Sequence, residues 1–75
     1  MTQPDFLHPD IWMRNVFAAK AVNRGGIIRR SLRDIDRVVG RDAFVTELRR
    51  RGFHAVENAG QMVIFCNQEP VRVVR

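Results

Sequence analysis

The order of the segments between residues 27 and 66 constrains this chain more than any other feature. The apolar pair Ile27-Ile28 leads into a stretch with helical periodicity, which ends at Gly40. A second helical stretch follows this glycine, and two apolar segments then flank Asn58-Ala59-Gly60, which is typical of a hairpin loop. Because another helical stretch precedes Ile27, the sequence predicts the order helix, strand, helix, helix, strand, strand.

Local signals at the ends of the helices place these elements. Pro9 suits the first turn of a helix, and Gly25-Gly26 would end that helix. Ser31 stands three residues before Asp34, close to the pattern of a capping box. The predicted helices are 10–23, 32–39 and 41–51, and the predicted strands are 27–30, 53–57 and 61–67, with a short extended tail or edge strand at 71–75. We therefore expect an α+β fold of three helices and a three-stranded antiparallel sheet.

The length of the chain, 75 residues, is that of one domain. We expect a leader at 1–9, the folded domain at 10–69 and a tail at 70–75. Lys and Arg number 13 and Asp and Glu number 8, which gives a net charge of +5. The isoelectric point is about 11.3, so the chain favours polyanionic partners.

Several classes of protein receive no support from the composition. One cysteine excludes an internal disulfide, and one cysteine with two histidines cannot form a closed zinc site. The segment 1–8 does not resemble a signal peptide, and the longest apolar run, 62–66, is too short to span a membrane. We expect a soluble, cytoplasmic protein without membrane association, metal or cofactor.

Residues 10–67 resemble the winged helix-turn-helix family in the order and length of their elements. The region Val38-Val39-Gly40-Arg41-Asp42 resembles the turn of a helix-turn-helix in its central glycine and in the apolar positions that follow. The resemblance implies DNA binding, often as a dimer and often in transcriptional control, with the second helix of the pair in the major groove. The predicted hairpin would then be the wing.

The outward face of the two helices joined at Gly40 is the predicted nucleic-acid site. Arginine suits this role because its guanidinium group pairs with phosphates and with guanine edges. The alternative is that these arginines only form a solvated face. DNA is the expected partner and RNA a possible one, and Arg29 and Arg30 would extend the patch. The predicted nucleic-acid-binding residues are Arg33, Arg37, Arg41, Thr46, Arg49 and Arg50.

Two alternatives compete with this interpretation. The first helix is apolar almost all round, so it would serve as a protein interface or as the contact of a homodimer, through Trp12, Val16 and Phe17; ordinary core packing would also explain it. The second is a single-stranded nucleic-acid binder, because Val39-Gly40-Arg41-Asp42-Ala43 also resembles the Gly-x-x-Gly loop of the KH domain.

Catalysis finds little support in the sequence. The chain has no Tyr and a single Ser, which capping explains. His54 and Glu57 are three residues apart on a predicted strand, so their side chains would lie on opposite faces. Cys66 belongs to an apolar strand and is expected to be buried. We therefore predict no enzyme, no catalytic residue and no small-molecule ligand.

Overall fold

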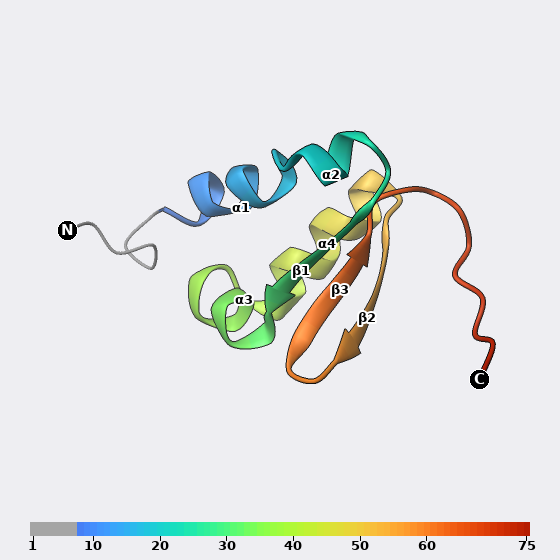
Figure 1. The fold of residues 1–75 in the computed structure, drawn as a ribbon. Coiled ribbons are helices and arrows are strands. Elements are labelled where there is room, and N and C mark those ends of the chain that lie inside the picture. Colours follow the sequence, from blue (N-terminus) through green and yellow to red (C-terminus); the bar gives the residue numbers. More distant parts are fainter. Residues whose placement is uncertain (1–7) are drawn as a thin grey trace.

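The computed structural model describes residues 8–75 and shows a small α+β fold (Figure 1). Residues 1–7, which make up most of the predicted leader, lie outside the described residues. The elements occur in the order that the sequence predicts, except that the first helix is divided. They are α1 (Pro9–Phe17), α2 (Lys20–Asn23), β1 (Ile27–Ser31), α3 (Leu32–Val38), α4 (Arg41–Arg51), β2 (His54–Asn58) and β3 (Gln61–Phe65).

The three strands form an antiparallel sheet in the order β1-β3-β2. Ile64 of the central strand lies opposite Ile28 on one side and Ala55 on the other. Side chains alternate along a strand, so these three positions share one face, which is the inner face. In Figure 1 the strands lie in front of α4, which packs behind them against this inner face. The sheet therefore has one covered face and one open face.

The first helix differs from the prediction of one continuous helix over 10–23. It is interrupted at Ala18-Ala19, where Ala19 is extended with φ −61° and ψ 146°. In a continuous helix, Phe17 and Val22 would point about 140° apart, because a helix has about 3.6 residues per turn. The interruption lets both side chains reach the core. Tertiary packing thus overrides the high helix propensity of alanine at this point.

The predicted helix ends are confirmed within one residue. Pro9 occupies the first turn of α1, and the Ser31 hydroxyl accepts a hydrogen bond from the Asp34 backbone N–H, with 3.3 Å between Oγ and N. Gly40 joins α3 to α4 with φ 87° and ψ 147°, a backbone conformation that residues other than glycine avoid. Gly52 ends α4 in the left-handed conformation.

The hairpin has a shorter loop than the sequence predicts. Asn58 belongs to β2, so the loop consists of Ala59 and Gly60 alone, with φ 51° and 76°. Two residues with positive φ are typical of a type I′ turn, whose twist matches that of the strands. The Leu32 backbone N–H donates to the Gly60 carbonyl at an N···O distance of 3.0 Å, which fixes the hairpin loop against the start of α3. The predicted tail or edge strand at 71–75 forms no strand.

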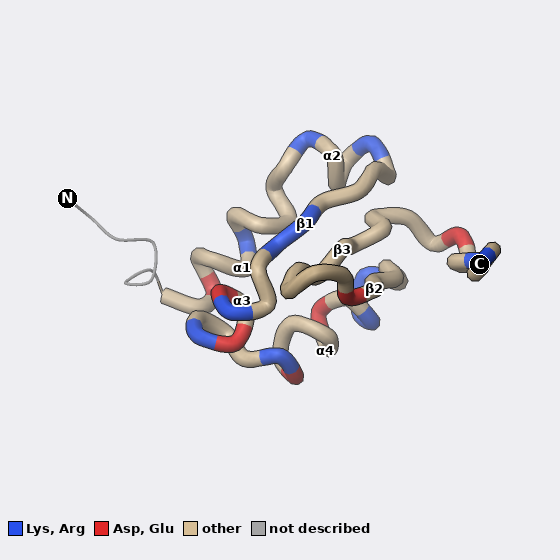
Figure 2. Tube along the Cα trace, turned by 60° about the horizontal axis from the view of Figure 1, so that its bottom comes forward, with Lys and Arg blue, Asp and Glu red and all other residues tan. Residues whose placement is uncertain are grey.

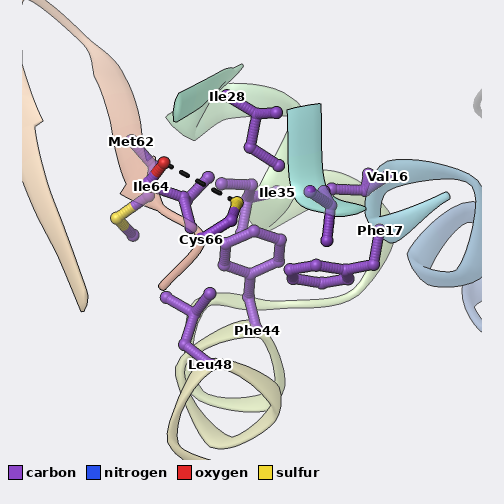
Figure 3. Close-up of a cluster of buried hydrophobic side chains, with 10 residues drawn as sticks. Val16, Phe17, Ile28, Ile35, Phe44, Leu48, Met62, Ile64 and Cys66 are labelled. Atoms are coloured by element: carbon purple, nitrogen blue, oxygen red, sulfur yellow. Dashed lines mark hydrogen bonds between the residues drawn. The ribbon is translucent and has the colours of Figure 1, made fainter. Parts of the chain in front are cut away.

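The core lies between the inner face of the sheet and the helices. Phe44, Ile35 and Ile64 are completely buried (Figure 3). The ring of Phe44 stacks on that of Phe17 at a centroid distance of 5.7 Å. Cys66 is buried in the same cluster, as the sequence predicts, and its Sγ lies 3.8 Å from the Ile64 carbonyl oxygen. This core joins α1 and α4 to the sheet.

Candidate nucleic-acid interface

The core fixes the orientation of α4. Because Phe44 and Leu48 are buried, the opposite side of this helix faces solvent. Thr46 and Arg49 are exposed on that side, and the small side chain of Ala43 stands beside them. An exposed helix face with a small residue, a hydroxyl and a guanidinium group can approach base edges closely. The three α4 residues predicted to face the groove, Thr46, Arg49 and Arg50, are thus all exposed.

The arginines at the junction of α3 and α4 form ion pairs with nearby carboxylates. The guanidinium group of Arg41 contacts both carboxylate oxygens of Asp36, at N···O distances of 3.1 and 2.9 Å, and also contacts Glu57 at 3.1 Å. The hydrogen bond from Arg41 lowers the pKa of the Asp36 carboxyl below its ordinary value. Arg37 contacts Asp34 at 3.0 Å. Both Arg37 and Arg41 would exchange a carboxylate partner for a phosphate if they bound DNA.

Glu47 holds two arginines at the end of α4. Its carboxylate accepts hydrogen bonds from Arg50 and Arg51, and the shortest contact to each is 2.6 Å. These bonds, that from Arg50 above all, lower the pKa of Glu47. Arg51 also lies over the ring of Phe17, with its Cζ 4.3 Å from the ring centroid. Arg51 therefore has a structural role, and Arg50 is partly neutralised.

We expect the substitution Glu47→Gln to flatten the acid dependence of stability. The pKa of Glu47 is lower in the folded protein than its ordinary value of 4.5. Its ion pairs therefore stabilise the fold fully above that pH, and the contribution is lost as the pH falls through the folded pKa. Urea unfolding between pH 3 and pH 7 measures this effect. Wild type and variant should converge at low pH, and parallel curves at all pH values would contradict the assignment.

Of the predicted nucleic-acid-binding residues, Arg33 and Arg49 have no carboxylate partner within residues 8–75. Both side chains are exposed, Arg33 near the start of α3 and Arg49 on α4. A guanidinium group without a protein partner can bind a phosphate without first breaking an ion pair. The structure therefore divides the predicted set into free groups, Arg33, Thr46 and Arg49, and paired groups, Arg37, Arg41 and Arg50.

The strongest separation of charge lies outside the helix pair. Residues 11–33 contain six Lys or Arg residues and no Asp or Glu, whereas the rest of the chain contains seven Lys or Arg and eight Asp or Glu. In Figure 2 the tube is blue without red along α2 and β1, while blue and red alternate around α3 and α4. This acid-free segment is visible in the sequence alone, but the predicted site includes only Arg33 of it, with Arg29 and Arg30 as an extension. Its members are Arg14, Lys20, Arg24, Arg29, Arg30 and Arg33.

The predicted interface residues of the first helix have different environments. Val16 and Phe17 are buried in the core of the single chain, whereas Trp12 is half-buried and packs on Phe44 at a ring-centroid distance of 6.2 Å. Ile11 is 41% exposed. A partner on α1 would therefore contact Trp12 and Ile11, but it would not reach Val16 or Phe17 without opening the core. A homodimer through this helix stays a prediction.

A cleft of about 520 Å³ lies between α4 and β2. Val45, Leu48 and Phe53 contribute apolar surface to it. His54 and Glu57 also line the cleft, but the register pairs His54 with Phe65 and Glu57 with Met62, so their side chains leave β2 on opposite faces. Residues 8–75 contain no cluster of three potential metal ligands, and none of their helices is long and apolar enough to cross a membrane.

Comparison with protein-family models, curated proteins and solved structures finds no match to this chain.

Proposed function

We propose that this protein binds DNA, as a regulator or an accessory factor, and that α4 enters the major groove. The tight turn at Gly40 sets α4 against α3, and the outward face of α4 presents Thr46 and Arg49 to solvent. These are side chains that form hydrogen bonds with base edges. The free guanidinium group of Arg33 would contact the DNA backbone.

The observation that best supports binding to a polyanion is the separation of charge, whereas the choice of α4 rests on the exposed Thr46 and Arg49. The acid-free segment 11–33 carries six positive charges, whereas the net charge of the whole chain is +5. A surface of this kind attracts a polyanion and gains affinity from the counterions that the polyanion releases. A purely solubilising surface gains nothing from excluding carboxylates over 23 consecutive residues, and mixed charges serve that purpose better.

Binding to a duplex at two salt concentrations tests the proposal. We expect Arg33→Ala with Arg49→Ala to weaken binding and to reduce the slope of log affinity against log salt by about 0.9, the contribution of the one phosphate contact, which Arg33 makes. Arg37→Ala with Arg50→Ala is the matched control, because it removes the same charge from groups that already have acid partners. Fluorescence anisotropy with a labelled 20-base-pair duplex measures both affinities.

The two double variants separate a specific contact from a general charge effect. A clearly smaller loss in the control pair supports contacts by Arg33 and Arg49. Equal losses in both pairs would mean that only net charge matters, and would contradict specific contacts by Arg33 and Arg49. The absence of any binding by the wild type at 50 mM salt would contradict DNA binding altogether.

A further inference from the structure

The side of the sheet that faces away from α4 forms an open surface, which we call the outer sheet face. All the helices of residues 8–75 lie on the other side of the sheet or beside it (Figure 1). Strand register assigns nine residues to this face, three from each strand. They are Ile27, Arg29 and Ser31 from β1, Gln61, Val63 and Phe65 from β3, and His54, Val56 and Asn58 from β2.

The outer sheet face exposes apolar residues and carries one arginine, Arg29. Ile27 is 50% exposed and Val56 is 42% exposed, while Phe65 lies half-buried between Ile27 and His54 in the register. None of the nine residues is acidic. The exposed Arg29 lies opposite Val63, so a positive charge stands directly beside the apolar residues.

We propose that the outer sheet face binds single-stranded nucleic acid. A single strand offers flat bases that stack on an aromatic ring and phosphates that pair with arginine. A base would stack on the ring of Phe65, and a phosphate would pair with Arg29. Arg24, just before β1, would extend the track of phosphate contacts. This inference goes beyond the proposed duplex site, because α4 lies on the opposite side of the sheet.

Charge decides between this ligand and a second copy of the chain. Two outer sheet faces packed together would bury apolar surface, but they would also bring two cationic faces into contact. Since neither face has a carboxylate, nothing would compensate the charge of Arg29 as it lost water. An acidic peptide would satisfy Arg29 but would not use the flat surface of Phe65. A nucleic-acid strand complements both features.

Anisotropy with a labelled dT12 strand, and with an rU12 strand of the same length, tests the inference on the full chain. We expect Phe65→Leu, which keeps the apolar volume, to weaken binding about fivefold or more, because stacking on one base is lost. Arg29→Gln should reduce the salt slope by about 0.7, the contribution of one single-strand phosphate contact. Arg72→Gln, in the exposed tail, is the charge-matched control and should bind like the wild type. Circular dichroism checks that each variant is folded.

The outcomes distinguish this inference from the duplex proposal. Weaker binding of either strand by the Phe65 and Arg29 variants, with duplex binding unchanged, supports a separate single-strand site, and the two strands show whether the sugar matters. Unchanged binding of both strands by Arg29→Gln would overturn the inference, whether or not Phe65→Leu folds. This result would not affect the proposal of a duplex site on α4, because the Arg33 and Arg49 variants test that proposal separately.

Discussion

Replacing Phe44 with alanine is expected to destabilise the protein by about 3–5 kcal/mol. The ring is completely buried, stacks on Phe17 and packs against Trp12. A domain of this length has a free energy of unfolding of roughly 4–11 kcal/mol, at about 0.05–0.15 kcal/mol per residue. The variant should therefore lose a large part of its stability, because Phe44 is where α1, α4 and the sheet meet.

Urea unfolding, followed by circular dichroism and by the fluorescence of Trp12, measures this loss. The chain has one tryptophan, and it packs on Phe44, so both signals should change together. Phe44→Leu should cost less than Phe44→Ala, since it leaves a smaller cavity. Val73→Ala is the control, because Val73 is 85% exposed, and it should change stability by less than about 0.5 kcal/mol. A loss below about 1 kcal/mol for Phe44→Ala would contradict the described core.

The second large effect is expected at the turn between α3 and α4. Gly40→Ala should cost about 1–3 kcal/mol, the strain of a side chain at φ 87° and ψ 147°. A Cβ atom at this position would meet no other atom within 4 Å, so the cost is conformational and involves no collision. Thermal unfolding of wild type and variant measures it.

A D-alanine at position 40 provides the decisive control. The chain is short enough for chemical synthesis, and a D-residue favours the mirror image of the backbone conformations that L-residues adopt. D-alanine should therefore destabilise the protein less than L-alanine does, because the positive φ at this position suits a D-residue. Equal destabilisation by L- and D-alanine would show that strain at Gly40 is not the cause.

Local signals in the sequence are sufficient for most of the fold. Pro9, Ser31, Gly40 and Gly52 each act within one turn of their own position, so their effects can be read without knowledge of the tertiary structure. The helices that they limit were predicted correctly at those ends. The apolar run of the central strand identified β3, although only one face of this strand is fully buried and Val63 and Phe65 on the other face are half-buried.

The missed features depend on contacts between distant residues. The interruption at Ala18-Ala19 serves the burial of Val22, and nothing near these alanines in the sequence indicates it. The contact between Arg41 and Glu57 joins residues 16 positions apart, so the sequence could not show that Arg41 is neutralised. The pairs of Glu47 with Arg50 and Arg51, by contrast, lie within about one helical turn and follow from the sequence alone.

The candidate site was only partly accessible from the sequence. The outward positions of α4 followed from its periodicity, and Thr46 and Arg49 are exposed as that periodicity predicts. The open side of the sheet required the strand register, because only the pairing of Ile27 and His54 with Phe65 brings these residues to one face.

Because Cys66 is buried, the reactivity of its thiol can be used to measure transient opening of the core. Burial raises the pKa of the thiol, so little of the reactive thiolate forms in the closed state, and the surrounding side chains block a reagent. Alkylation can proceed only when the core around Cys66 opens transiently. Since the chain has no other cysteine, the rate of alkylation gives the free energy of that opening without an engineered label. Protection of the thiol by an added oligonucleotide would reveal binding even where no dye is attached.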